Sequence, residues 1–225
     1  MSAATLLAPL TELVGHLRWR VGPPEPGELA GAELAGDPDF LAAAVTTTAN
    51  GRGSEDPQVL GSLWWQAYAY RVGGTTAACW VLGGAAPDPG IDPGTSVTIA
   101  RDRPSSVTYG PTAEPVSDLR ELLGLLFAGH LDPVAGSLRS RHALGEQLVW
   151  GDAAAGIAAA LSAVATAPGA PPIRRRADEL IGALPHGMAR LGRWEDTWSF
   201  RRRTCCLWWK TTAANGALCE DCSLR

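Results

Sequence analysis

The sequence predicts an α+β fold that is mostly α-helical, with a small β-hairpin or sheet and a cysteine-bearing segment at its C-terminal end. Three observations support this prediction. Apolar residues recur at helical spacing over most of the chain, two short β-rich runs flank a turn, and four of the five cysteines lie after residue 204. With 225 residues, of which 46% are hydrophobic and 19% charged, the chain has the composition of a globular protein with one full core.

Most of the expected helices follow from apolar residues at helical spacing. Leu6, Leu10 and Leu13 fall on one stripe of the first helix. Asp37 and Pro38 are a typical N-cap and first turn of the second. The expected helices are residues 5–20, 37–48, 58–82, 116–129, 130–140, 143–167 and 177–188.

Extended structure is expected at two places. Residues 96–101 and 105–109 are short runs of strand-forming residues separated by a turn, which predicts a hairpin. Residues 194–203 have no helical period and are expected to be extended. These patterns divide the chain into an N-terminal helical region that no motif places (1–57), a body (58–200) and a cysteine-bearing tail (201–225).

The formal net charge of −4 is unevenly distributed, because residues 1–173 are acidic and the C-terminal end from Arg174 onward is basic. This balance argues against nucleic acid as the main partner and favours a local anion-binding or electron-transfer surface. The N-terminal sequence lacks the basic start of a secretory signal, and no apolar stretch reaches about 18 residues. We therefore expect a cytoplasmic protein that does not span a membrane, in which clustered cysteines bind metal more often than they form disulfides.

The strongest functional signal is the cysteine pattern of the tail. Cys205 and Cys206 are adjacent, and a twelve-residue spacer separates them from Cys219 and Cys222, which form a CxxC. Four thiolates that can converge on one point make a metal site or a redox site. Adjacent Cα atoms lie about 3.8 Å apart and their side chains point opposite ways in an extended chain, so the first pair needs a bend. A zinc ribbon usually pairs two CxxC-like turns, whereas a two-iron cluster is wider and accepts an adjacent pair more easily.

This tail resembles the C-terminal signature of FhuF-type ferric-siderophore reductases, in which a CC…CxxC pattern binds a 2Fe–2S cluster. Residues 201–204 resemble the basic run before the first cysteine of that family. Residues 144–156 and 62–68 resemble two upstream segments of the family, in the same order. The likeness extends over roughly residues 60–225.

The chain departs from the family pattern at two points. The spacer has twelve residues where the family usually has ten, and Asp152 stands where the family has Asn. Asn215 and Gly216 make a natural turn within the spacer, which can absorb two extra residues.

The resemblance implies a cytoplasmic iron–sulfur oxidoreductase that passes one electron to the Fe(III) of a siderophore and releases Fe(II) for iron assimilation. It implies that Cys205, Cys206, Cys219 and Cys222 bind the cluster, and that no catalytic residue is needed beyond these ligands. One electron is enough because hydroxamate and catecholate oxygens hold ferric iron far better than ferrous iron. No glycine-rich dinucleotide fingerprint lies between a strand and a helix, so the electrons are expected from a partner such as a ferredoxin or a flavin-dependent reductase.

Residues beside the cysteines are candidates for binding substrate or partner. Arg201, Arg202 and Arg203 can contact an anionic siderophore, a donor protein or the negative charge of a cluster; alternatively they form a solvated basic strand. Trp208 and Trp209 can shield a cluster from water or stack against a siderophore; alternatively they pack the tail onto the body.

Two functions of other classes remain open from the sequence. The tail can hold zinc in a binding or scaffold module, or it can be a thiol redox sensor with a disulfide between Cys205 and Cys206 or between Cys219 and Cys222. The fifth cysteine, Cys79, lies on an apolar helix and is expected to be a buried small hydrophobe rather than a ligand.

Overall fold

The computed structural model describes residues 2–49, 51–92, 94–100, 103–194, 198–219 and 221–224. It confirms the mostly α-helical α+β fold. The helices are α1 (Ala3–Leu13), α2 (Gly31–Gly36), α3 (Pro38–Ala49), α4 (Pro57–Ala69), α5 (Thr75–Gly83), α6 (Leu119–Leu126), α7 (Asp132–His142), α8 (Glu146–Thr166) and α9 (Arg174–Ala183). The strands are β1 (Arg18–Val21), β2 (Glu28–Ala30), β3 (Ala86–Pro87), β4 (Ser96–Ala100), β5 (Arg103–Tyr109), β6 (Pro115–Val116), β7 (Gly192–Trp194) and β8 (Phe200–Arg202).

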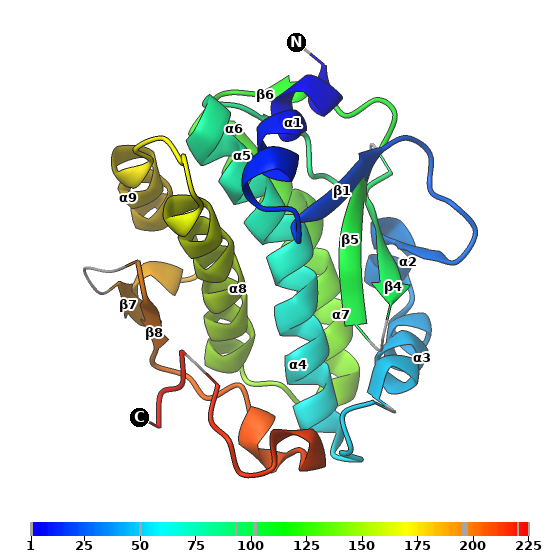
Figure 1. The fold of residues 1–225 in the computed structure, drawn as a ribbon. Helices are drawn as coiled ribbons and strands as arrows, with labels where there is room; N and C mark the ends of the chain where they lie inside the picture. The colour runs from blue at the N-terminus through cyan, green and yellow to red at the C-terminus, as the bar shows by residue number, and fades with distance from the viewer. Residues whose placement is uncertain are drawn as a thin grey trace.

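Helices α4 and α8 form the centre of the molecule (Figure 1). The sheet that contains β1, β4 and β5 lies on one side of this pair, whereas α9, β7 and β8 lie on the other. The tail, drawn in orange to red, crosses the ends of α4 and α8 at which both helices begin. The two central helices therefore carry the surface on which the cysteines are held.

The expected helix 58–82 is confirmed as α4 and α5, joined without a break by a π-helical turn over Tyr70–Gly74. Gly156 of α8 lies against this turn so closely that a Cβ there would be 2.9 Å from the Tyr70 backbone nitrogen. Among the described residues, α8 is a helix long and apolar enough to cross a membrane, and 72% of its apolar window is buried inside the protein. Its apolar surface is accounted for by packing in the core, as in the central helix of a globular protein.

The expected hairpin is confirmed as β4 and β5, which pair antiparallel within a four-stranded sheet of order β1-β5-β4-β2. Residues 101–102, at its turn, lie outside the described residues. The expected helix 5–20 is wrong in its second half, because α1 ends at Leu13 and β1 pairs in parallel with β5. The partner strand is far away in the sequence, so local periodicity could not reveal this pairing.

The other helix predictions hold with shifted ends. Helix α3 begins after Asp37, whose side chain accepts hydrogen bonds from the amides of Asp39 and Phe40, as the N-cap prediction requires. The predicted helix 116–129 begins instead at Leu119, because Pro115–Val116 pairs with β3. The remaining three are present as α7, α8 and α9. Residues 200–202 are extended, as predicted, whereas residues 195–197 lie outside the description.

The N-terminal 57 residues belong to the same core as the body. Leu7, Leu10, Leu34 and Leu41 have no exposed surface, and they join the cluster of buried residues that includes α4 and α8. This region is also not purely helical, because it supplies β1 and β2 to the sheet.

Glu28 on β2 ties this region to the hairpin. Its side chain is 5% exposed, and its carboxylate accepts hydrogen bonds from the side chains of Arg20, Ser96, Thr98 and Thr108 and from the Glu25 amide. Burial alone would raise the pKa of this carboxyl. The hydrogen bonds outweigh burial and lower the pKa to about 2.

Replacing Glu28 with Gln is expected to lower the free energy of unfolding by about 2–4 kcal/mol, because several donors lose a charged acceptor. The folded-state pKa of about 2 lies below the unfolded value of 4.5. The contribution of Glu28 is therefore fully present above pH 4.5 and is lost as the pH falls toward 2. Urea denaturation at several pH values measures both effects. Glu25→Gln, at a position whose side chain is 66% exposed, is the matched control and should change stability by about 1 kcal/mol or less.

Candidate cysteine site

The tail is fastened to the body by a buried ion-paired triad, Asp152–Arg202–Asp221. Arg202 on β8 donates from Nη1 to Oδ1 of Asp152 at 2.7 Å and from Nε to Oδ2 of Asp221 at 2.7 Å. The side chains of Arg202 and Asp152 have no exposed surface, and that of Asp221 is 24% exposed. The triad thus joins α8, β8 and the residue before the last cysteine.

Helix α4 joins this network through Ser62. The Ser62 hydroxyl lies 2.7 Å from Oδ2 of Asp152 and 3.1 Å from the carbonyl oxygen of Cys206, and can donate to either. Ser62 is fully buried, so its hydroxyl has no alternative partner in water. The Ser62 hydroxyl therefore lies between Asp152 of α8 and the backbone of the second cysteine, and links both to α4.

Burial and ion pairing shift the pKa values of Asp152 and Arg202 in opposite directions. Burial raises the pKa of Asp152 to about 7, although the Arg202 charge and the Ser62 hydroxyl oppose the shift. Burial alone would lower the pKa of Arg202, but the carboxylates of Asp152 and Asp221 raise it instead. Arg202 therefore keeps its charge, and the two carboxylates compensate for it inside the protein.

A glycine on α8 brings the tail close to the helix. A Cβ at Gly151 would lie 2.0 Å from Oγ1 and 2.9 Å from Cβ of Thr204, the residue before the first tail cysteine. Only the absence of a side chain at this position lets Thr204 approach the helix.

Replacing Gly151 with Ala is therefore expected to push residue 204 off α8 and to lower the free energy of unfolding by about 1–3 kcal/mol. Thiol-labelling rates of Cys205 should rise as the tail detaches, and urea denaturation gives the stability change. Gly136→Ala on α7 is the matched control, since a Cβ there would meet no atom within 4 Å. This control should be neutral or stabilising by up to about 1 kcal/mol.

The structure brings two of the four tail cysteines into contact. The sulfurs of Cys206 and Cys219 are 3.5 Å apart. Cys206 and Cys222 are buried, whereas Cys205 and Cys219 are half-buried. The chain turns directly after the adjacent pair, where Leu207 has a left-handed backbone with φ of 64°.

The spacer between the two pairs turns back as the sequence predicts. Asn215 and Gly216 both have positive φ, and the Ala217 amide donates to the Ala214 carbonyl across them at 2.8 Å. Thr212 also donates its amide to the Gly53 carbonyl, so the spacer rests against the segment before α4.

The contact with Cys219 lowers the pKa of Cys206 to about 6. Burial opposes this shift, while the Arg202 charge and the backbone N–H of Trp208 assist it. The same contact raises the pKa of Cys219. The two sulfurs are therefore arranged to share one negative charge, as a thiolate that accepts a hydrogen bond from the neighbouring thiol.

The donor set of the tail fits an iron–sulfur cluster. The described cysteines are all free thiols, and four of them lie on this one segment. Backbone N–H groups reach two of the sulfurs, from Trp208 to Cys206 and from Leu224 to Cys222 at 3.4 Å, and such hydrogen bonds tune the potential of clusters. Within the described ranges, no three His, Cys, Asp or Glu side chains are gathered as a ready-made metal site.

The basic run before the cysteines divides between the interior and the surface. Arg202 is buried in the triad, so in this structure its side chain is not available at the surface. Arg203 is exposed and Arg201 is half-buried. Asp221, the triad member that we did not single out from the sequence, lies inside the CxxC itself, where an acidic residue could have signalled a partner for the basic run.

The two tryptophans of the tail also differ in their surroundings. Trp208 is half-buried and the Arg52 guanidinium lies 5.7 Å from its ring centre, whereas the Trp209 side chain is 46% exposed.

The fifth cysteine, Cys79, is fully buried and its thiol donates to the Leu6 carbonyl at 3.3 Å. Burial raises the pKa of Cys79 to about 12, which makes it unreactive, as expected for a small core residue.

The three segments that resemble FhuF-type reductases meet at one point of the structure. Ser62 comes from the first segment, Asp152 from the second, and Arg202 with Cys206 from the tail.

Compared with known proteins, the chain matches no protein-family model, and no curated protein matches its sequence.

Proposed function

We propose that this protein is a cytoplasmic ferric-siderophore reductase that binds a 2Fe–2S cluster through Cys205, Cys206, Cys219 and Cys222. The observation that carries the proposal is the network joining Ser62, Asp152 and Arg202 to the tail. It connects three segments distant in the sequence and fixes the backbone of Cys206 next to the sulfur of Cys219. A tail held in this way keeps Cys206 and Cys219 at a defined place on the body, from which metal binding can draw in the other two cysteines.

Each part of the site has a defined role in this proposal. The four cysteine sulfurs bind the iron, and the Arg202 charge beside Cys206 offsets part of the negative charge of the thiolates. The half-buried Trp208 limits the access of water to the sulfurs of Cys206 and Cys219. When bound, the cluster would supply a one-electron redox centre.

The reaction needs one electron for each iron. An external donor, such as a ferredoxin or a flavin-dependent reductase, supplies the electron, and siderophore-bound Fe(III) becomes Fe(II). The oxygen ligands of the siderophore bind Fe(II) much more weakly, so iron is released without cleavage of a siderophore bond.

The deciding experiment is an anaerobic ultraviolet–visible and electron paramagnetic resonance spectrum of the purified full-length protein, supplied with iron and sulfide, before and after dithionite. We expect the absorbance bands of a two-iron cluster, which should weaken on reduction. The reduced cluster should give a rhombic paramagnetic signal of total spin one half. A colourless, silent protein that retains zinc would contradict the proposal and assign the tail to a zinc-stabilised module.

A second candidate function is a thiol redox switch, and the 3.5 Å contact between the sulfurs of Cys206 and Cys219 favours it. Oxidation of the two thiols by hydrogen peroxide would form one S–S bond and reduce the peroxide to two water molecules. The pair differs from those that the sequence indicated, because it joins the first cysteine pair to the second. Peptide mapping by mass spectrometry after mild oxidation tests for this disulfide.

A further inference from the structure

A cavity of about 480 Å³ opens beside the two cysteines whose sulfurs are in contact. Cys206, Cys219 and Trp208 line it, together with residues of α4, α8, the π-helical turn after α4 and the start of β5. This volume falls within the range of small-molecule sites, about 300–1,000 Å³. The cavity is thus large enough for a compact metal chelate next to the proposed redox centre.

Apart from the Cys206–Cys219 pair, the charged groups among the described lining residues of the cavity are basic. Arg52, Arg71 and Arg103 line it together with His16, and none of its described lining residues is a carboxylate. The guanidinium groups of Arg71 and Arg103 contribute a positive potential, which a concave surface concentrates.

Arg71 is the clearest example of an arginine of this cavity that lies close to other arginines. Its guanidinium donates to backbone carbonyls, Nη1 to His16 at 2.5 Å and Nε to Pro104 at 3.4 Å. Burial lowers the pKa of Arg71, and the charges of Arg103 and Arg18 lower it further, against an opposing contribution of Tyr70. Arg71 is therefore held among like charges, and a bound anion would relieve their repulsion.

Aromatic rings complete the lining. Tyr70 stands beside Arg71, whose guanidinium carbon lies 4.9 Å from the Tyr70 ring centre, and Trp208 lies next to the cysteines. The Tyr70 ring already stacks against His16 and the Arg71 guanidinium, so a flat aromatic ligand such as a catecholate would stack on Trp208 while its charge faces the arginines.

From this geometry we infer that the cavity binds an anionic, aromatic chelate of ferric iron, of the tris-catecholate class, with its metal directed toward Cys206 and Cys219. The inference rests on the proposed function, to which it adds the location and charge preference of the substrate site. Three catecholate dianions around Fe(III) make a trianion, whereas three hydroxamates make a neutral complex, so the arginines discriminate between the two classes.

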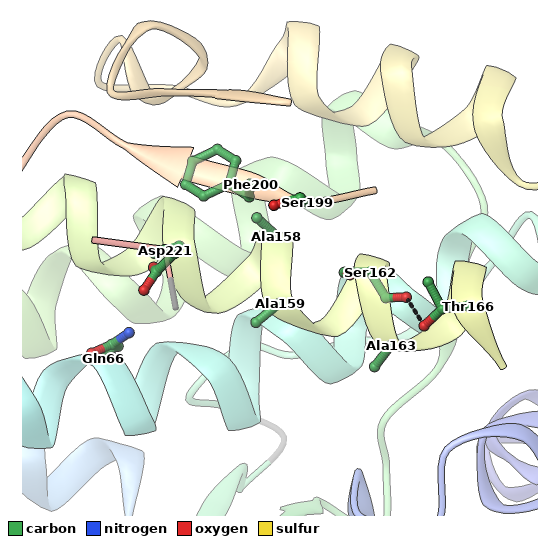
Figure 2. Close-up of a pocket in the computed structure, with 10 residues that line it drawn as sticks. Gln66, Ala158, Ala159, Ser162, Ala163, Thr166, Ser199, Phe200 and Asp221 are labelled. Carbon is green, nitrogen blue, oxygen red and sulfur yellow. Dashed lines mark hydrogen bonds between the residues drawn. The ribbon is translucent and has the colours of Figure 1, made fainter. Parts of the chain in front are cut away.

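A neighbouring cavity of similar volume differs from the first in the charge of its lining. It has a volume of about 460 Å³ and shares Gln66 and Ala159 with the first cavity. Figure 2 shows that small side chains of α8 line it, with Phe200 on one side and Asp221 on another. Its charged lining residue is acidic, and no cysteine lines it, so this cavity is suited neither to an anion nor to electron transfer from the sulfurs.

Gallium(III) chelates test the site without electron transfer, because gallium(III) has the charge of Fe(III) but does not accept an electron from biological donors. Isothermal titration calorimetry at low salt would compare a gallium tris-catecholate with a gallium tris-hydroxamate of similar size. The full-length protein is used both as isolated and after supply of iron and sulfide. We expect the catecholate to bind at least about tenfold more tightly, and this preference to shrink as salt is added.

Arg103→Gln should weaken catecholate binding by about tenfold, and Arg103→Lys should restore most of it. Arg103 is exposed, so the protein should fold without it. The matched control is Arg175→Gln on α9, where the side chain is 82% exposed and lies outside the cavity; it should leave the affinity unchanged.

Equal affinities for the two chelates, or equal losses in the Arg103 and Arg175 variants, would overturn the inferred site. Failure of the site and failure of the proposed function remain distinguishable. A protein that forms the cluster and reduces ferric chelates without any charge preference refutes only the site. A protein that binds the gallium catecholate through Arg103 but forms no cluster refutes only the reductase.

Discussion

Replacing Cys219 with Ser is expected to abolish the visible absorbance and the reduction-induced paramagnetic signal of the loaded protein, and with them the reduction of ferric chelates. The change removes one of four thiolates, and it removes the sulfur that lies 3.5 Å from Cys206. Serine is a much weaker ligand for iron in a cluster of this kind. Spectra of the variant, loaded in parallel with the unmodified protein, measure the loss.

Cys79→Ser is the matched control for this change. Cys79 is fully buried and its thiol faces backbone carbonyls, away from the tail, so the variant should keep the cluster spectrum even if its stability falls. A Cys219 variant that kept full reductase activity without a cluster would remove the tail from the mechanism.

Cys205→Ser separates the two candidate functions. A cluster needs all four tail cysteines, so this variant should lose the cluster as Cys219→Ser does. A redox switch needs only Cys206 and Cys219, so the disulfide between them should still form in the Cys205 variant. Under the cluster proposal, Cys205→Ser should remove the cluster spectrum that the loaded unmodified protein shows. Under the switch proposal, the unmodified protein shows no cluster spectrum, and the variant should keep its disulfide map.

Local signals in the sequence were sufficient for much of the helical framework. The helical spacing of apolar residues and the N-cap at Asp37 predicted α3, α4 with α5, and α8. Both signals depend only on residues that are close together in the sequence. The strands β1 and β2 were missed since their partners are distant in the sequence: Arg18 of β1 pairs with Ser106, and Glu28 of β2 pairs with Thr98. Short strands of this kind are stabilised by tertiary pairing rather than by their own composition.

In the candidate site, too, local features could be predicted from the sequence and long-range contacts could not. The cysteine spacing and the turn at Asn215 and Gly216 are local and could be predicted. The attachment of the tail could not, because Ser62 is separated from Asp152 by 90 residues and Asp152 from Arg202 by 50. Sequence reasoning placed Arg202 among residues that could meet a partner, whereas the structure buries it between two carboxylates. A run of three arginines gives no local indication of which one turns inward.

The cavity beside the cysteines was also beyond sequence reasoning. Its arginines come from the segment before α4, from the π-helical turn and from the start of β5, and no motif connects them. Only the folding of these segments around the tail brings Arg52, Arg71 and Arg103 to one concave surface. Their shared chemistry becomes visible only in three dimensions.

Replacing Arg202 with Gln is expected to lower the free energy of unfolding by about 3–5 kcal/mol, because it leaves the fully buried carboxylate of Asp152 without a compensating charge. Asp152→Asn should cost less, about 1–2 kcal/mol, since Arg202 keeps Asp221 and an amide can still accept a hydrogen bond from the guanidinium. Urea denaturation of the two single variants and the double variant gives their coupling energy.

Loss of Arg202 should also loosen the tail, because Asp152 and Asp221 then no longer hold β8, the strand before Cys206, in place. Thiol labelling of Cys206, which is 2% exposed, should accelerate strongly, and iron loading should fall. The matched control is Arg203→Gln, at the adjacent exposed position, which should change stability by no more than about 0.5 kcal/mol. If Arg202→Gln and Arg203→Gln had the same small effect, the buried triad would not be what holds the cysteine tail to the body.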